Sequence, residues 1–471
     1  MVGITSYGAH VPYHRLGRSE IARAWGGVSI GGERAVANWD EDSLSMAVEA
    51  ARDCVTGTKL ERIDGLFFAS TTSPFKEKQA ATMIATAVDL RQDILTMDCA
   101  STLRAGTNAL KAAADAVKAG SAKQILVTAA DCRLGAPDSI LEQRFGDGAA
   151  AFLVGDTNVI ASIEGSYSFS NELTDVWRRE QDQFVHVWED RFIMSQGYQA
   201  IMAKTISAAM KKYKLTPQDF AKVVLYATDD RSHSALAKSL GFDAKTQVQK
   251  CPFDTVGNTG AAFSLMTLAL ALETANPGDN ILVASYGDGC DVLILKVTPE
   301  IKKLKGNRGV SKHIASKKML SSYEQYLRFR GLVGADVSRN PDVIAPSTLI
   351  LRERNSFMRF HASKCHQCGE VQWPIQRICG NCNSKDDFDE IPISDTQGTI
   401  FTFTEDTIGF TNDLNNLLAV VDFDAGFRSR ISVANAEKDE LAIGMRIEMT
   451  FRKFIREGDV PIYSWKCKPV S

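Results

Sequence analysis

Short apolar runs alternate with helical patterns over the first 300 residues of the chain. Three of these runs, at residues 63–70, 125–131 and 149–155, have the length and composition of buried strands. Between the first two lies an alanine-rich stretch from Leu103 to Gly120 that carries few polar side chains. It predicts a helix that is buried on most sides and ended by its glycine. Strands that alternate with helices in this way indicate an α/β fold.

A helix-start signal stands farther along, at Thr216 and Pro217. Threonine can cap the free N–H groups of a first helical turn, and proline suits the first helical position, where no N–H is needed. The pair therefore predicts a helix that begins at Thr216.

One sequence pattern occurs twice. Gly106 opens an apolar helical stretch that ends at Gly120 before Ile-Leu-Val-Thr-Ala, and Gly260 opens a similar stretch that ends at Gly278 before Ile-Leu-Val-Ala-Ser. The repeat predicts a large domain of two similar halves, although such stretches also recur in many unrelated α/β proteins. In both halves a loop leads to the amino end of a buried helix. The free N–H groups of the two ends could converge on one site that favours negative charge.

Composition limits the classes of protein and partner. The chain has 471 residues, of which 44% are hydrophobic and 24% charged, and a formal net charge of -3. These values predict a well-packed protein of two or three domains. So small a charge gives no general attraction for nucleic acid or anionic membranes, and no apolar run has the length of a membrane span. We expect neither as a partner.

The start of the chain and most of its cysteines predict a cytoplasmic protein. Residues 1–5 begin directly as a strand, which predicts that no signal peptide precedes the fold. Six cysteines are scattered without the spacing of a disulfide framework, which suits a reducing compartment. They are Cys54, Cys99, Cys132, Cys251, Cys290 and Cys467.

The other four cysteines form two C-x-x-C pairs separated by ten residues. They are Cys365, Cys368, Cys379 and Cys382. Gly369 and Gly380 directly follow a cysteine and are expected to allow the two chain reversals that turn the thiolates toward one ion. Four sulfur ligands favour zinc and leave no position open for water or substrate. The sequence therefore predicts a structural Zn²⁺ site.

Three segments carry a resemblance that extends over the first 300 residues. They are Arg-Phe-Gly-Asp-Gly-Ala-Ala-Ala-Phe at 144–152, Val-Gly-Asn-Thr-Gly-Ala-Ala at 256–262 and Ala-Ser-Tyr-Gly-Asp-Gly at 284–289. In these segments the chain resembles the 3-hydroxy-3-methylglutaryl-CoA synthase and ketoacyl synthase III branch of the thiolase superfamily. The resemblance implies a duplicated five-layer thiolase fold, an acyl-CoA thioester as ligand or substrate, and a homodimer formed through this domain.

From about residue 320 onward the chain resembles the zinc-ribbon and OB-fold proteins that accompany such enzymes. The cysteine quartet carries one part of this resemblance, and short strand patterns carry the other. These patterns lie at residues 398–404, 417–423, 430–434 and 444–450. We expect a thiolase-like domain at 1–300, a basic linker with a docking helix at 301–355, a zinc ribbon at 356–390 and an OB-fold β-barrel at 391–471.

Basic residues are dense where the two parts join. They are Lys302, Lys303, Lys305, Arg308, Lys312, Lys317 and Lys318. Such a segment could attract the phosphates of coenzyme A, or it could be a solvated linker. Residues 323–331 have the pattern of an amphipathic helix that docks on the thiolase-like domain.

The resemblance places the family's nucleophilic cysteine at Leu103, five residues after Asp98. A leucine cannot attack a thioester or carry an acyl group. The family's general acid glutamate falls at Thr71, and its histidine falls at Tyr226. Covalent acyl transfer is therefore not expected of this chain.

Other groups at the implied site could still act on a thioester. Asn258 could polarise the thioester oxygen, and the amides of Gly287 and Gly289 could complete an oxyanion pocket. Tyr226 could serve as an acid or a base. The neighbouring Asp229 and Asp230 could assist it in proton transfer, or they could simply be solvated.

The remaining candidates have ordinary structural interpretations. His233 is expected on an exposed helix surface. Cys99 has no helix terminus or histidine beside it to lower its pKa, so the sequence favours a buried, unreactive thiol over a displaced nucleophile. Cys251 and Cys290 receive the same interpretation, with Cys290 kept as a minor candidate because it directly follows the glycine turn.

Two functions follow from these observations. In the first, the chain is a structural or channelling subunit that bridges to a separate, active thiolase and passes acyl-CoA between sites. In the second, the chain is itself a cysteine-independent acyl-CoA lyase or condensing enzyme that uses Tyr226 and Asn258. No nucleotide-binding fingerprint is present, so redox cofactors are not expected.

Overall fold

The computed structural model describes residues 1–333, 347–406, 416–455 and 461–470. Contacts between residues divide it into two compact units. Unit 1 contains Met1–Ala37, Asp42–Ala85 and Arg91–Phe329, and unit 2 contains Asn38–Glu41, Thr86–Leu90 and Arg330–Ser471. Residues 334–346 of the expected linker lie outside the described residues, as do 407–415, 456–460 and 471 of the expected barrel.

Five strands form the amino-terminal half of the main sheet of unit 1. They are β1 (Gly3–His10), β4 (Gly65–Ala69), β5 (Leu95–Cys99), β6 (Gln124–Asp131) and β7 (Gly148–Gly155). Their order is β1-β7-β6-β4-β5; β7 is antiparallel to both neighbours, whereas β6, β4 and β5 run parallel. The three apolar runs are confirmed as the strands β4, β6 and β7.

Four strands repeat this arrangement in the carboxy-terminal half. They are β8 (Ala161–Ser170), β11 (Lys222–Leu225), β12 (Asn280–Tyr286) and β13 (Gly289–Val297). Their order is β8-β13-β12-β11, with β13 antiparallel to both neighbours and β12 parallel to β11. An isolated parallel bridge from Val223 to Val248 stands in the place of the fifth strand. The predicted duplication is therefore present, and β1 pairs with β8 to join the halves into one nine-stranded sheet.

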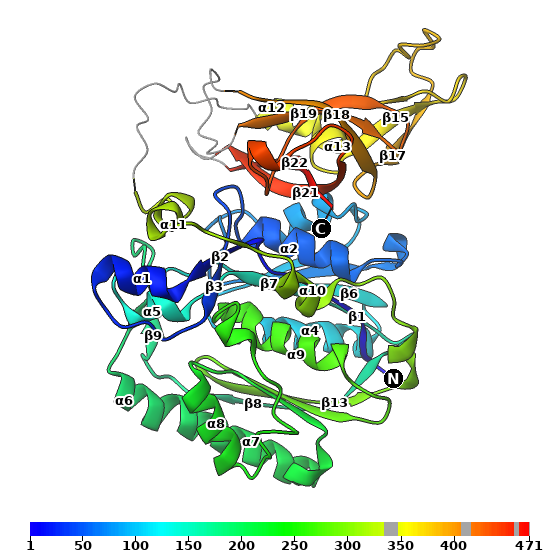
Figure 1. The fold of residues 1–471 in the computed structure, drawn as a ribbon. Coiled ribbons are helices and arrows are strands. Elements are labelled where there is room, and N and C mark those ends of the chain that lie inside the picture. The colour runs from blue at the N-terminus through cyan, green and yellow to red at the C-terminus, as the bar shows by residue number, and fades with distance from the viewer. Residues whose placement is uncertain (334–346, 407–415, 456–460, 471) are drawn as a thin grey trace. The chain divides into compact units, whose positions relative to one another are not determined.

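Helices cover and separate the two halves of the sheet (Figure 1). On one side, α2 (Ser43–Cys54) and α10 (Gly309–Ala315) pack on β1. Between the halves lie α4 (Ala105–Ala119) and α9 (Phe263–Glu273). On the far side, α7 (Gln199–Tyr213) packs on β8 and β13, with α8 (Asp230–Ser239) beside it. Unit 1 thus has alternating layers of helix and sheet.

The two inner helices meet at their amino ends. The helix predicted from Leu103 to Gly120 is confirmed as α4, with Gly120 as its left-handed C-cap at φ +78°. A Cβ placed on Gly106 would lie 2.6 Å from the carbonyl oxygen of Ala261 and 3.1 Å from Leu265. Only a glycine allows this approach, which brings together the two helix ends that the repeat predicted.

The remaining elements of unit 1 are short. A small sheet contains β2 (His14–Gly17), β3 (Glu33–Val36) and β14 (Lys318–Met319), and a hairpin contains β9 (Val176–Trp177) and β10 (His186–Val187). The other helices are α1 (Arg18–Trp25), α3 (Ala80–Ala87), α5 (Ile140–Arg144), α6 (Asp190–Phe192) and α11 (Tyr323–Phe329).

Residues 301–329, expected in a basic linker, are ordered parts of unit 1. The segment includes α10, which buries Val310 against β1 and α9, and β14, which pairs with β2. Helix α11 follows and also packs on unit 1. The Tyr323 hydroxyl donates to the Glu142 carboxylate at 2.7 Å, and the Arg34 guanidinium lies 5.0 Å from the Tyr326 ring centroid. The apolar residues between the lysines therefore pack the segment onto the sheet, while most of the lysines remain in solvent.

The helix expected at Thr216 does not form. A single 3₁₀ turn, Pro217–Asp219, stands there instead. The Asp219 carboxylate accepts from the N–H and the hydroxyl of Thr216 at 2.7 and 2.8 Å, and the chain then enters β11. The capping signal is real, but the apolar residues that follow it pair with β12 as a strand.

Unit 2 begins with two short helices and a small sheet. The helices are α12 (Ser347–Arg352) and α13 (Arg354–Phe357). The sheet has the order β16-β15-β17 and contains β15 (His361–Cys365), β16 (Val371–Gln372) and β17 (Phe388–Pro392). No helix among the described residues of either unit is long and apolar enough to cross a membrane.

A five-stranded antiparallel sheet completes unit 2, in the order β20-β19-β18-β21-β22. Its strands are β18 (Gln397–Glu405), β19 (Leu417–Phe423), β20 (Arg428–Ser432), β21 (Arg446–Ile455) and β22 (Ile462–Pro469). A bridge from Val433 to Cys467 brings the two edges together, so the sheet is nearly closed. The four expected strands are present. Sequence reasoning missed β22, because Lys466 and Lys468 interrupt its apolar pattern.

Candidate functional site

The loop before α4 meets the glycine turn after β12. Leu103 lies just before α4, and a Cβ placed on Gly287 would come within 2.9 Å of the Leu103 nitrogen. Arg104 ties the two segments together, since its guanidinium donates to the Asp288 carbonyl at 3.0 Å and pairs with the Asp291 carboxylate at 3.1 Å. Gly287 has φ +154° and no room for a side chain. Leu103 therefore lies beside the turn that was expected to hold an oxyanion.

One of the two amides expected in that oxyanion pocket has a partner within the turn. The N–H of Gly287 donates to the carbonyl of Gly289 at 3.0 Å. Gly289 has φ +122°, and a Cβ there would meet the Phe169 carbonyl oxygen at 2.0 Å. These contacts explain why both positions need glycine, and they leave the Gly287 amide unavailable to a ligand in this conformation.

The half-buried side chain of Leu103 packs against the hydrophobic core cluster of the second half of unit 1. Tyr226 lies in this cluster, with its ring centroid 6.4 Å from Tyr198, 6.2 Å from Tyr286 and 5.4 Å from Phe263. Tyr226 thus belongs to the core cluster against which Leu103 packs.

Two other phenols of the cluster donate to fixed acceptors. Tyr198 donates to the Tyr226 carbonyl at 2.7 Å, and Tyr286 donates to the Asp175 carboxylate at 2.5 Å. Burial, with a smaller contribution from the Asp175 hydrogen bond, raises the pKa of Tyr286 far above its usual range. Burial also raises the pKa of Asp175. Sequence reasoning missed the pairing of Tyr286 with Asp175, because Asp175 stands in an irregular loop far from Tyr286 in the sequence.

Thr71, the position implied for the general acid, is bound to Asp131. The Thr71 hydroxyl donates to Oδ2 at 2.9 Å, and its backbone N–H donates to Oδ1 at 2.7 Å. Asp131 also accepts from the hydroxyls of Ser70 and Thr72 at 3.0 and 2.9 Å and from the Ala261 N–H at 2.7 Å. These donors balance the buried carboxylate. The hydroxyl hydrogen of Thr71 is therefore engaged in the hydrogen bond to Asp131.

Asn258 uses its whole side-chain amide inside the protein, where it is only 3% exposed. Its Oδ1 accepts from the Arg133 guanidinium at 2.8 Å and from the Gly260 N–H at 3.0 Å. Its Nδ2 donates to the Tyr226 hydroxyl at 3.0 Å and to the Ala227 carbonyl at 2.9 Å. Asn258 and Tyr226 are therefore in direct contact, but this arrangement leaves Asn258 no hydrogen for a thioester oxygen.

Arg133 was missed by sequence reasoning. It follows the carboxyl end of β6, is 4% exposed, and places its guanidinium carbon 4.1 Å from the Phe145 ring centroid. A signal for it was present, because ligands of α/β sheets bind beyond the carboxyl ends of the strands. Both Asp131 and Arg133 stand at such an end.

Asp229 and Asp230 have different roles. The Asp229 carboxylate caps α8, where it accepts from the N–H and the hydroxyl of Ser232 at 2.8 and 3.0 Å. Most of the surface of Asp230 is exposed, but the partial burial of its carboxylate and then the nearby Asp254 carboxylate raise its pKa. The first aspartate therefore stabilises a helix end, a role that the sequence interpretation did not consider.

The prediction that His233 is exposed is wrong, because its exposed fraction is 6%. On α8 it shares the inward face with Leu236 and Ala237, and its Nδ1 lies 3.6 Å from the Cys251 sulfur. Burial lowers the pKa of His233 to about 4 and raises that of Cys251 to about 12. Both groups are therefore neutral at pH 7, which leaves Cys251 without a reactive thiolate.

The other two candidate thiols are also protonated at pH 7. Cys99 ends β5 as expected and is half-buried, and burial followed by the charge of Asp98 raises its pKa. Cys290 is fully buried, and burial raises its pKa far above the usual range. These environments agree with the interpretation of unreactive thiols.

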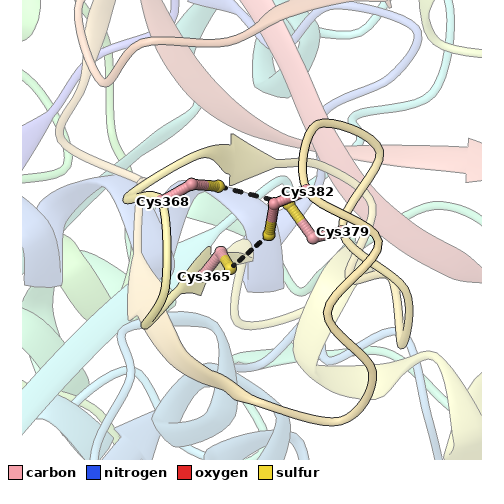
Figure 2. A group of neighbouring side chains, drawn as sticks. All are labelled: Cys365, Cys368, Cys379 and Cys382. Carbon is pink, nitrogen blue, oxygen red and sulfur yellow. Dashed lines mark hydrogen bonds between the residues drawn. The ribbon is translucent and has the colours of Figure 1, made fainter.

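The cysteine quartet converges in unit 2 (Figure 2). All four sulfurs lie within 4.8 Å of one another, with 3.6 Å between Cys365 and Cys382 and 3.5 Å between Cys368 and Cys379. The backbone N–H of Cys368 lowers the pKa of Cys365 to about 7, which favours its thiolate. A compact group of four sulfurs suits one tetrahedral metal ion.

The two C-x-x-C turns reverse the chain at different positions. Gly369 has φ +77°, and its N–H donates to the Cys365 carbonyl at 2.9 Å. Gly380 does not adopt a left-handed conformation, contrary to expectation. Asn383 does so three residues later, with φ +62° and an N–H that donates to the Cys379 carbonyl at 2.9 Å. Asparagine tolerates this conformation better than most residues, so the reversal needs no glycine.

Comparisons with known proteins extend over most of the chain. Residues 210–296 match the family described as 3-oxoacyl-[acyl-carrier-protein (ACP)] synthase III C terminal. The hydroxymethylglutaryl-CoA synthase of Methanopyrus kandleri is 32% identical over 341 residues, which cover 70% of this chain and 97% of that protein. The synthase of Archaeoglobus fulgidus is 33% identical over 350 residues, which cover 71% of this chain and 100% of that protein.

Solved structures show the same fold at lower sequence identity. An HMG-CoA synthase complexed with CoA has a TM-score of 0.65 and 18% identity, and the match covers 73% of this chain and 94% of that one. The 3-oxoacyl-[acyl-carrier-protein] synthase III of Aquifex aeolicus has a TM-score of 0.57 and 20% identity, with 63% of this chain and 100% of that one covered.

Proposed function

Because this chain belongs to the hydroxymethylglutaryl-CoA synthase family of the thiolase superfamily, we propose that it binds acyl-CoA thioesters in unit 1 without forming a covalent acyl intermediate. Solved relatives in complex with CoA and with 3-hydroxy-3-methylglutaryl coenzyme A support a CoA thioester as the ligand. In this proposal the chain is a structural or channelling subunit of a complex in which a separate thiolase cleaves or forms C–C bonds of acyl-CoA.

Leu103 is the observation that carries the proposal. It stands where the family resemblance puts the nucleophile, beside the Gly287 turn and against the cluster of Tyr226. An aliphatic side chain offers no bond to an acyl group. Thr71, at the position of the general acid, is engaged with Asp131. The residues that would form and cleave a covalent acyl intermediate are therefore replaced, while the surrounding fold is retained.

Unit 2 supplies the other part of the proposal. We propose that Cys365, Cys368, Cys379 and Cys382 hold a structural Zn²⁺, since their sulfurs already cluster and leave no ligand position open. The nearly closed five-stranded sheet that follows supports an OB-fold, and in this proposal unit 2 bridges to the thiolase.

A second candidate function is a cysteine-independent acyl-CoA lyase or condensing enzyme. The contact between Asn258 and the Tyr226 hydroxyl favours it, because the Asn258 amide holds a buried phenol in the cluster against which Leu103 packs. Such a phenol can take part in proton transfer without a covalent intermediate.

A trapping experiment tests the absence of a covalent intermediate. The full chain is incubated with acetyl-CoA labelled in its acetyl group, and intact-protein mass spectrometry follows. We expect no acetyl adduct, and pretreatment with iodoacetamide should leave any activity unchanged. A stoichiometric adduct on this chain would refute the proposal.

A second experiment separates the subunit from the enzyme. The chain is purified with and without a thiolase from its own organism, and thiolytic cleavage of several 3-oxoacyl-CoA esters is assayed. We expect turnover only when the thiolase is present, together with co-elution of the two proteins. Turnover by the chain alone that is lost in Tyr226→Phe would favour the lyase or condensing enzyme.

A further inference from the structure

The partners of Asn258 determine the orientation of its amide. Arg133 and Gly260 both present N–H groups to one end of the amide, and Ala227 presents a carbonyl oxygen to the other end. A guanidinium only donates, so the atom that faces Arg133 must be Oδ1. A reversed amide would place donors against donors at two contacts and an acceptor against an acceptor at the third. The hydrogens of Nδ2 must therefore point to Ala227 and Tyr226.

This orientation decides the role of the Tyr226 hydroxyl. Its oxygen already accepts an N–H from Asn258, so its own proton must point elsewhere. Within the described part of the chain, that proton has no acceptor at hydrogen-bond distance. Tyr226 is 3% exposed, and buried donors are rarely left unused. An oxygen atom of a bound molecule would supply the missing acceptor.

Arg133 adds a buried positive charge to this chain of hydrogen bonds. It forms no ion pair with any carboxylate of the described residues, and the nearby Asp131 directs both oxygens to other donors. Its guanidinium instead stacks on Phe145 and donates to Asn258. Hydrogen bonds in such a chain polarise one another, so the charge strengthens the Tyr226 hydroxyl as a donor. It also favours negative charge on whatever oxygen accepts that proton.

We propose that Arg133 is a positioning residue that holds Asn258 so that Tyr226, and not Asn258, donates the hydrogen bond to the thioester carbonyl oxygen of an acyl-CoA. The inference rests on the proposed function, because it requires a CoA thioester in unit 1. Leu103 packs against the cluster that contains the donor, so the position implied for acyl attachment and the proposed donor share one region.

A comparison of a thioester with a thioether tests the assignment. Acetyl-CoA and S-ethyl-CoA are similar in size and share the CoA part, but only acetyl-CoA has a carbonyl oxygen. Their affinities for the full-length chain are measured by isothermal titration calorimetry. We expect acetyl-CoA to bind roughly five- to tenfold more tightly, the ratio that one net hydrogen bond gives. In Tyr226→Phe the ratio should fall to about one, with the affinity for S-ethyl-CoA unchanged.

Two variants of Arg133 test its positioning role. Arg133→Met removes both the N–H donor and the charge, so the ratio should fall close to that of Tyr226→Phe. Arg133→Gln can still donate to Asn258 but lacks the charge, so its ratio should lie between those of Arg133→Met and the wild type. Tyr213→Phe is the matched control, because among the residues that the structure describes the Tyr213 hydroxyl bonds only to the backbone of Ser166. Its ratio should equal that of the wild type.

Each outcome addresses one claim. A wild-type ratio in Tyr226→Phe overturns the assignment of the donor. A wild-type ratio in folded Arg133→Met overturns the positioning role. A wild-type ratio in Arg133→Gln overturns the contribution of the Arg133 charge, whether or not Arg133→Met folds. If the wild type binds neither CoA derivative, the proposed function itself fails. Equal binding of the two derivatives by the wild type contradicts only the present inference.

Discussion

The side chains at the positions implied for catalysis bond to other residues of the chain. The Thr71 hydroxyl donates to Asp131, and the Asn258 amide donates to Tyr226. In a site that turns over a covalent intermediate, such groups would be expected to face the reacting atoms. Here their hydrogen bonds stabilise the fold of the site. In our proposal the Tyr226 proton is left for a ligand, and unit 1 binds and polarises a thioester.

His233 predicts a pH dependence of stability. Burial holds the pKa of His233 at about 4 in the folded chain, against 6.5 for an exposed histidine. Below pH 6.5 the unfolded chain therefore binds a proton that the folded chain resists until about pH 4. The free energy of unfolding falls as the pH falls through this window, by up to about 3 kcal/mol.

Urea unfolding of the wild type and of His233→Gln between pH 7 and pH 4 measures this effect. The carboxylates titrate in both proteins, so the difference between the two curves isolates the histidine. We expect the wild type to lose more stability than the variant on acidification. Parallel curves would show that His233 is not a buried neutral group.

The packing of α4 against α9 depends on a single missing side chain. Gly106→Ala would place a methyl group 2.6 Å from the Ala261 carbonyl oxygen, so the two inner helices would have to move apart. We expect a loss of roughly 1–3 kcal/mol in the free energy of unfolding, as overpacking of a core produces. Chemical denaturation followed by circular dichroism measures it.

Asn108→Ala is the control for this experiment, because Asn108 lies exposed on the same helix. Alanine favours helix more than asparagine, so this variant should be neutral or slightly more stable. Equal stability of Gly106→Ala and the wild type would contradict the close approach of the helices.

The two C-x-x-C turns are a second element whose stability depends on a few residues. We expect one zinc per chain by elemental analysis of the purified protein, and loss of that zinc in Cys368→Ser. Removal of the metal by a strong chelator should lower the thermal stability of unit 2, because metal binding contributes to folding. Cys99→Ser, which changes a thiol outside the quartet, should retain the metal. Full zinc content in Cys368→Ser would refute the site.

Among the described residues, no strand pairs with one edge of the main sheet. At one end, β11 is bridged by Val248. At the other end is β5, which carries Leu95 at 57% exposure. Its one charged residue, Asp98, directs its carboxylate to the N–H groups of Ala80 and Ala81 at 2.8 Å. The edge thus lacks the outward charges that prevent strands from pairing, which supports a homodimer through unit 1.

Sedimentation equilibrium tests this arrangement. We expect the wild type to be a dimer and Leu95→Lys to be largely monomeric, because a lysine on the edge strand opposes pairing. Val28→Lys, at a position 86% exposed outside the sheet, should remain a dimer. A monomeric wild type would rule the arrangement out.

The sequence by itself determined the features that depend on local periodicity and spacing. The apolar runs became β4, β6 and β7, the glycine-bounded repeat became the two halves of the sheet, and the C-x-x-C pairs brought four sulfurs together. In each case the signal lies within a few residues, or repeats at a regular interval, so no knowledge of distant contacts was needed.

Only the tertiary structure decided which partners the site residues have. Arg133 meets Asn258 across 125 positions of sequence, and Asn258 meets Tyr226 across 32. His233 is buried because α8 packs with its inward face on the core, and residues 301–329 are ordered because they add to unit 1. Contacts between distant segments decide whether a side chain is buried and whether all its hydrogen-bonding atoms have partners. The pattern along the chain therefore shows which groups are present, and the fold decides which of them are free to bind.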